Sequence, residues 1–91
     1  MPAELDRLRQ TAPDLERLDP LSDEVRTWLD QAYVALKRVD IVESTIFKLH
    51  ERSLLDPARK SVASAEIVET IDRARATRAL MRQKGLVRRA S

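Results

Sequence analysis

The fold is decided by residues 23–54, whose sequence is DEVRTWLDQAYVALKRVDIVESTIFKLHERSL. This stretch contains no Pro or Gly. Ser22, just before it, is typical of a helix start, because its hydroxyl can accept a hydrogen bond from an unpaired backbone N–H. We predict one helix from about Asp23 to about Leu54, roughly 45 Å long at the α-helical rise per residue. Such a helix exceeds the diameter of any globule that a chain of 91 residues can form.

An apolar stripe with alternating steps of four and three residues follows this predicted helix and should be buried. Its members are Trp28, Ala32, Ala35, Val39, Val42, Ile46 and Leu49, widened by Val25, Leu29 and Leu36. On the opposite side, Val34 and Ile41 form a row that Leu55 continues. Either this row is a second, intersubunit face, or it is the chance exposure that is common on protein surfaces. The predicted oligomer interface is Trp28, Val34, Val39, Ile41, Val42, Ile46 and Leu49.

The flanking sequence completes a helical hairpin. Residues 2–19 predict one or two short helical turns with leucines at Leu5, Leu8, Leu15 and Leu18, and Asp19-Pro20 ends them. Asp56-Pro57 predicts the start of a second helix and Lys84-Gly85 its end, with a buried stripe of Ala63, Ile67, Ile71, Ala74 and Met81. The short link makes the two helices antiparallel. We therefore expect one all-α domain over 1–91, comprising a helical arm (1–22), a hairpin (23–84) and a basic tail (85–91).

Composition favours an oligomer in solution. The chain has 91 residues, a mass of 10.4 kDa, no Cys and one His, so neither disulfides nor a tetrahedral zinc site can reinforce its small core. Association between copies is the remaining source of stability. One Gly and three aromatic residues favour helix over sheet. No stretch resembles a membrane span or a signal peptide, so we expect a cytoplasmic protein without membrane contact.

Charge is distributed unevenly along the chain. Residues 1–24 hold seven acidic and three basic side chains, whereas residues 73–91 hold seven basic and no acidic ones. The candidate nucleic-acid or partner-binding residues are Arg75, Arg78, Arg82, Lys84, Arg88 and Arg89. They can contact phosphates without reading bases, or remain a solvated basic face, or attract the acidic N-terminus of another subunit. The aromatic residues lie on the other predicted helix, so no base-stacking platform accompanies the basic cluster.

No constellation in the sequence predicts catalysis. His50 follows Glu43 by seven residues, but neither a nucleophile nor a set of metal ligands converges with this pair. There is no Gly-rich phosphate loop. We expect a helix-end or interface role for His50, no enzymatic activity, no cofactor and no metal.

The layout resembles the small subunit of tailed-phage terminases. The shared features are a long helix with an Ala32-Tyr33 step, a break at Asp56-Pro57, a returning helix, and Gly85-Leu86 before a basic tail. The resemblance spans about residues 23–89. It implies a hairpin that oligomerises into a ring and helps deliver DNA to the large terminase subunit, which carries the ATPase and nuclease activities. Residues 1–22 are too short for the N-terminal helix-turn-helix found in many such subunits, so recognition of a specific packaging site is not expected.

The expected function is therefore a non-catalytic oligomeric adaptor in DNA packaging, in the cytosol of a bacterium or a phage-infected host. Its expected partners are other copies of the chain, the large terminase subunit, and DNA through non-specific phosphate contacts. Two alternatives remain open. One is a scaffold, virion or adaptor protein whose hairpin binds another protein, and the other is a small nucleic-acid-associated regulator. The mass in solution separates these interpretations, because a ring, a dimer and a monomer favour the terminase-like, regulator and adaptor functions respectively.

Overall fold

The computed structural model describes the backbone of residues 4–90 and the side chains of residues 4–81. Four helices account for most of this range: α1 (Glu4–Gln10), α2 (Asp23–Val39), α3 (Ile41–Ser53) and α4 (Lys60–Ala90). No strand occurs among the described residues. The predicted all-α fold is thus confirmed for the described part of the chain.

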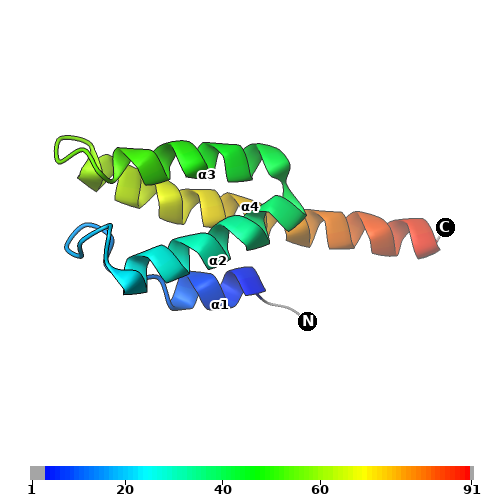
Figure 1. The fold of residues 1–91 in the computed structure, drawn as a ribbon. Helices are drawn as coiled ribbons and strands as arrows, with labels where there is room; N and C mark the ends of the chain where they lie inside the picture. Colours follow the sequence, from blue (N-terminus) through cyan, green and yellow to red (C-terminus); the bar gives the residue numbers. More distant parts are fainter. Residues whose placement is uncertain (1–3, 91) are drawn as a thin grey trace.

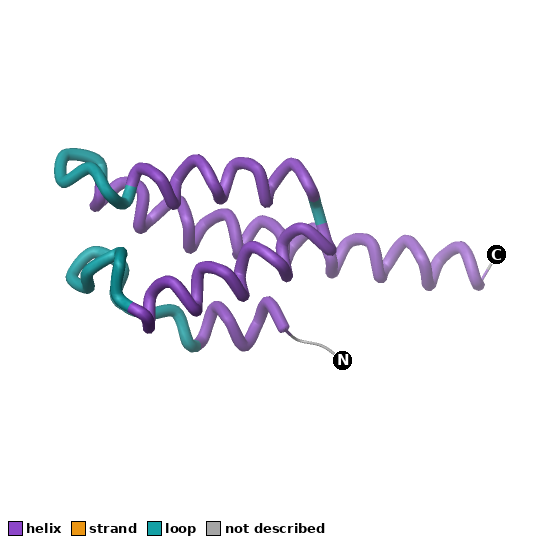
Figure 2. The backbone as a smooth tube through the Cα atoms, viewed as in Figure 1, coloured by secondary structure: helices purple, strands orange, loops and turns teal. Residues whose placement is uncertain are grey.

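The four helices alternate in direction and form a small bundle (Figures 1 and 2). α1 packs against α2 and α4, and α3 packs against the same two helices from the other side. The C-terminal part of α4 continues past the ends of the other helices (Figure 1), so that the molecule measures 52 × 20 × 16 Å. A bundle with a projecting helix therefore replaces the expected two-helix hairpin.

The predicted single helix over residues 23–54 is wrong, because Asp40 divides it. Asp40 is extended (φ −155°, ψ 110°), and its N–H donates to the Leu36 carbonyl, which closes α2. Its Oδ1 accepts from the N–H of Val42 at 2.9 Å and of Glu43 at 3.3 Å, which opens α3. One residue therefore caps both helices and lets α3 fold back along α2.

The change of direction at Asp40 redistributes the predicted apolar stripe. Before the turn, Trp28, Ala32 and Ala35 are buried as expected. After it, the core-facing side of α3 carries Ser44 and Phe47, and the later members of the stripe are exposed or half-buried. The core consists of Leu5, Leu8, Leu15, Val25, Trp28, Leu29, Ala32, Ala35, Leu36, Phe47, Leu54, Ala63, Ile67, Ile71 and Ala74.

The boundaries of α4 also differ from the prediction. The helix begins at Lys60 rather than Pro57, and it continues through Gly85 to Ala90 instead of ending there. Its buried stripe runs as predicted through Ala63, Ile67, Ile71 and Ala74, but Met81 is exposed. Among the described side chains of α4, the buried stripe therefore ends at Ala74.

The described part of the N-terminal arm packs against the bundle. Leu5 and Leu8 of α1 are buried, and the indole Nε1 of Trp28 donates to the Leu8 carbonyl at 3.0 Å. Farther along, the ammonium group of Lys60 donates to the Leu18 carbonyl at 2.9 Å. These bonds satisfy buried or half-buried carbonyls that would otherwise lose water without compensation.

Candidate functional site

The basic residues at the middle of α4 are engaged within the chain. Arg75 Nε lies 2.5 Å from Asp6 Oδ1, and Arg75 Nη1 lies 3.1 Å from Asp72 Oδ1. Asp72 also accepts from Arg9 Nε at 3.2 Å. The predicted attraction between the acidic N-terminus and the basic residues of α4 thus occurs within a single chain, between α1 and the middle of α4.

These contacts limit what Arg75 can do for an outside partner. The hydrogen bond to Asp6, followed by the one to Asp72, raises the pKa of Arg75. The guanidinium therefore stays charged, but a phosphate or carboxylate from outside must compete with two carboxylates already bound to it. Arg73 is similarly occupied, with Nη2 3.3 Å from Glu43 Oε2.

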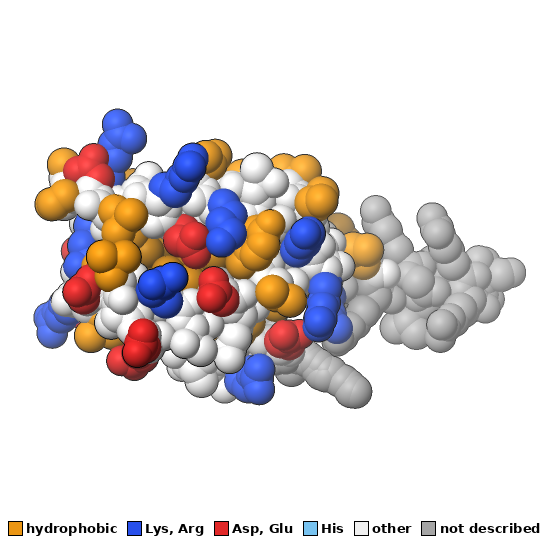
Figure 3. Space-filling model, viewed as in Figure 1, with side chains coloured by type: hydrophobic (Ala, Val, Ile, Leu, Met, Phe, Trp, Pro, Cys, Tyr) orange, Lys and Arg blue, Asp and Glu red, His pale blue; other side chains and the backbone are white. Residues whose placement is uncertain are grey.

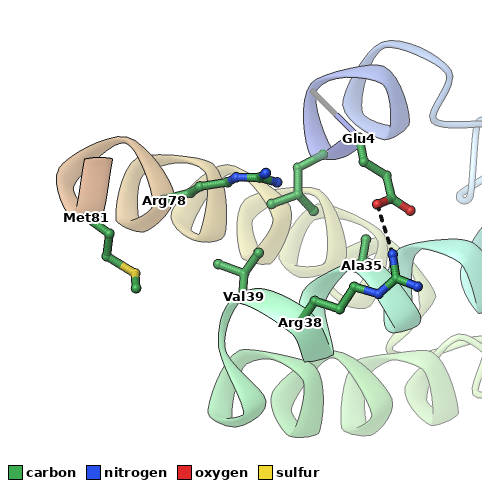
Figure 4. Close-up of a pocket in the computed structure, with 7 residues that line it drawn as sticks. Glu4, Ala35, Arg38, Val39, Arg78 and Met81 are labelled. Carbon is green, nitrogen blue, oxygen red and sulfur yellow. Dashed lines mark ion pairs between the residues drawn. The ribbon is translucent and has the colours of Figure 1, made fainter. Parts of the chain in front are cut away.

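Arg78 borders a cavity of about 430 Å³ between α1, α2 and α4 (Figure 4). Leu5, Ala35, Val39 and Met81 supply apolar walls, and Glu4 and Arg38 supply polar ones. Arg38 Nη1 pairs with Glu4 Oε2 at 3.6 Å, and the guanidinium of Arg78 points toward the α1 side (Figure 4). Arg78 is half-buried, so it belongs to the end of the bundle rather than to the projecting helix.

The side chains of the four remaining basic candidates, Arg82, Lys84, Arg88 and Arg89, lie outside the described residues. The backbone that carries them is helical, and it runs beyond the other helices (Figure 1). We call residues 82–90 the C-terminal extension. The sequence contains no acidic residue after Asp72, so the extension has basic residues and no acidic ones.

The residues of the predicted oligomer interface do not share one surface. Trp28 is only 5% exposed and its indole is bonded to α1, so within one chain it is part of the core. Val39 and Ile46 are half-buried. The remaining four are exposed: Val34, Ile41, Val42 and Leu49. The turn at Asp40 separates these side chains, because it ends the single helix on which they would have formed rows.

A groove between α2 and α3 gathers further exposed residues that the helical pattern of residues 23–54 does not indicate. It encloses about 360 Å³ and is lined by Pro20, Leu21, Arg26, Leu29, Asp30, Lys48, Glu51, Arg52 and Leu55. Lys48 lies over the ring of Tyr33, 4.4 Å from its centroid, and also pairs with Glu51 at 3.2 Å. Apolar, basic and acidic side chains alternate over this face (Figure 3). Leu21 was missed because it follows a proline in a turn, outside any helical pattern.

His50 is placed between α3 and α4. Its Nε2 lies 4.0 Å from Glu66 Oε2, whereas Glu43 pairs with Arg73 instead of orienting the imidazole. In the part of the chain that the structure describes, no group of three or more potential metal ligands converges. The histidine therefore contributes to contact between two helices.

An acidic surface lies at the opposite end of the bundle from the C-terminal extension. A groove of about 390 Å³ there is lined by Thr11, Pro13, Asp23, Glu24, Thr27, Trp28 and Gln31. A neighbouring groove of about 290 Å³ includes Asp14 and Glu16 beside Ser61 and Ser64. We call residues 14–24 the acidic end. The sequence indicates these charges but not their place in the molecule.

No family model matches the sequence, and neither a curated protein nor a solved structure is similar enough to count as a match. Among the described residues, no helix combines the length and apolar character needed to cross a bilayer.

Proposed function

We propose that this chain is a non-catalytic adaptor that uses the C-terminal extension of α4 to contact DNA. In the specific form implied by the terminase resemblance, it self-associates and helps deliver DNA to the large packaging subunit in the cytosol. The observation that carries the proposal is the contrast along α4. Arg73 and Arg75 pair with carboxylates of the bundle, whereas the backbone that carries the basic residues of the extension lies beyond the bundle, in a stretch of α4 without acidic residues.

A projecting basic helix suits phosphate contact for a physical reason. Lys and Arg side chains that neutralise phosphates release condensed counterions, and this release drives binding without any base readout. The extension offers Arg82, Lys84, Arg88 and Arg89 within fewer than three helical turns. The proposal does not require the long hairpin helix of the resemblance, which Asp40 interrupts, nor a helix end at Gly85.

The DNA contact is tested by neutralising the extension at constant chain length. The test variant carries Arg82→Gln, Lys84→Gln, Arg88→Gln and Arg89→Gln. Its matched control carries Arg7→Gln, Arg26→Gln, Lys37→Gln and Arg59→Gln, which remove the same charge from exposed positions on the bundle outside the acidic end. Duplex DNA binding is followed by fluorescence anisotropy between about 50 and 200 mM salt.

We expect the test variant to bind more weakly and the control to bind nearly as the native chain does. The log–log salt slope of the test variant should fall by roughly 0.9 for each phosphate that is no longer neutralised, hence by up to about 3.6 for four phosphates. Equal affinities and slopes for the test variant and the native chain would refute DNA contact through the extension.

A second candidate function, a protein-binding adaptor, is favoured by the groove between α2 and α3. Exposed leucines at Leu21 and Leu55 border it, and Ile41 is 64% exposed on the same pair of helices. Exposed apolar residues ringed by charges are common in protein interfaces. If the extension proves irrelevant to DNA, this groove is the next surface to substitute, with Leu21→Ser and Leu55→Ser tested against the large terminase subunit. The third alternative, a regulator, would require a stable dimer in solution.

A further inference from the structure

The bundle separates positive and negative charge along its long axis. The acidic end carries Asp14, Glu16, Asp19, Asp23 and Glu24 against one base, Arg17. Arg17 Nε already pairs with Asp14 Oδ2 at 3.5 Å, and nearby Lys60 donates to the Leu18 carbonyl. Among the described residues, Glu16, Asp23 and Glu24 have no basic side chain within 4.0 Å.

The two charged regions cannot meet within one molecule. The acidic end lies beside the first turns of α4, because Asp14 and Glu16 share a groove with Ser61 and Ser64. The extension is at the other end of the same continuous helix (Figure 1). At the helical rise per residue, Ser61 and Arg89 are roughly 40 Å apart along the axis. A continuous helix keeps them apart, so any neutralisation of one by the other is between molecules.

We propose that the C-terminal extension of one copy docks against the acidic end of a second copy. The partner bound at the acidic end is thus another copy of this chain, because the charge of its extension is opposite to that of the acidic end. The groove of about 390 Å³ beside Asp23 and Glu24 offers basic side chains of the docked helix a place next to two carboxylates. Exposed Leu80 and Met81, just before the extension, add apolar contact at its base.

The contact is head-to-tail, which has consequences for assembly. Each copy uses two different surfaces, so a bound pair still has one acidic end and one extension free. Such heterologous contacts continue until a ring closes or a filament grows. The inference rests on the self-association included in the proposed function and identifies the two surfaces that meet. It is tested without nucleic acid, so it can fail or hold independently of DNA contact.

The test uses two variants. In each, one of the two charged surfaces is neutralised and the other is left intact. The tail variant is the fourfold Gln variant of the extension. The head variant carries Glu16→Gln, Asp23→Asn and Glu24→Gln, which leave the Ser22 cap in place. Masses are measured by sedimentation equilibrium on nuclease-treated protein at low and high salt, and circular dichroism confirms that each variant is helical. The fourfold bundle variant serves as the control for net charge.

We expect the native chain and the bundle control to form species larger than dimers at low salt and to dissociate as salt rises. The tail and head variants should each be monomeric. An equimolar mixture of the tail and head variants should form a one-to-one dimer and nothing larger. The head variant supplies one intact extension, and the tail variant supplies one intact acidic end.

Three outcomes overturn the proposal: a native chain that is monomeric at low salt, single variants that assemble like the native chain, or a mixture that stays monomeric. Assembly of both variants would point instead to the α2–α3 groove. The head variant keeps its extension, so its DNA affinity separates the two proposals. DNA binding without the predicted mass pattern refutes only the head-to-tail contact, and the mass pattern without DNA binding refutes only the DNA function.

Discussion

The inner part of α4 and its C-terminal extension belong to one helix but have different surroundings. In the inner part, Ile67, Ile71 and Ala74 are fully buried, and Arg73 and Arg75 are held by carboxylates from α1, α3 and α4 itself. The extension continues where no other helix runs beside it (Figure 1). The same residue type, arginine, therefore stabilises the fold in the inner part, whereas we propose a binding role for it in the extension.

This difference shows that spacing in the sequence does not tell which residues of a basic cluster are paired within the fold. Seven basic residues follow Asp72, and by spacing they form one tract. The bundle divides the tract: among the described side chains, Arg73 and Arg75 pair with carboxylates of α3 and α1, and Arg78 borders the cavity at the end of the bundle. Substitutions at the two parts should accordingly affect different properties, namely stability for the inner part and association for the extension.

The largest expected effect comes from the buried stripe of the inner part. Ile71→Ala removes a side chain that is 0% exposed, and the reduced burial plus the cavity should lower the free energy of unfolding by about 2 to 5 kcal/mol. Ile41→Ala is the matched control, because Ile41 is 64% exposed and its truncation should change stability little. Truncation after Met81 should likewise cost far less than Ile71→Ala. Urea unfolding followed by circular dichroism measures all three.

A truncated chain that loses as much stability as Ile71→Ala would contradict the division of α4. It would mean that the extension packs on the bundle and that the two parts form one structural unit. Loss of stability in Ile41→Ala alone would instead indicate that the α2–α3 face is buried by association.

An intermediate effect is expected at Asp40, near the end of the bundle where α4 leaves it. Asp40→Ala removes the carboxylate that accepts from the N–H groups of Val42 and Glu43, so it should cost about 0.5 to 2 kcal/mol. Asp40→Asn keeps an acceptor and should retain most of the stability. Thermal unfolding of both variants, with Ala as the damaging change and Asn as the control, tests this role. Similar losses in both would implicate the charge of Asp40 rather than its capping bonds.

The sequence predicted those features that depend on neighbouring residues. The Ser22 cap, the burial of Trp28, Ala32 and Ala35, and the stripe of α4 up to Ala74 all follow from local spacing. The turn at Asp40 was missed although Asp40 and Glu43 have the spacing of a helix N-terminus. The apolar stripe continues in phase across Asp40, without Pro or Gly, and the change of direction is stabilised by packing of α3 against α2 and α4, which local spacing does not indicate.

The candidate site was less predictable because it depends on contacts distant in sequence. Asp6 and Arg75 are 69 residues apart, and no periodicity in either helix indicates that they pair. The Gly85 stop failed for a related reason. A glycine after a basic last turn favours a helix end, but its cost inside a helix is only about 1 kcal/mol relative to alanine, too little to determine the end by itself.

The smallest expected effect is a difference in melting temperature between substitutions at two arginines, one in the inner part of α4 and one in the extension. Arg75→Gln should lower the melting temperature by less than Asp40→Ala does, because exposed ion pairs are screened and contribute little. Since hydrogen bonds to Asp6 and Asp72 raise the pKa of Arg75, its contribution is present across the neutral pH range and is lost as the guanidinium deprotonates in strong alkali. Added salt should shrink the difference from the native chain. Arg82→Gln, the matched control from the extension, should leave the melting temperature unchanged at low and high salt. Equal losses for both variants would place Arg82 in the ion-pair network of the bundle and remove the distinction between the two parts of α4.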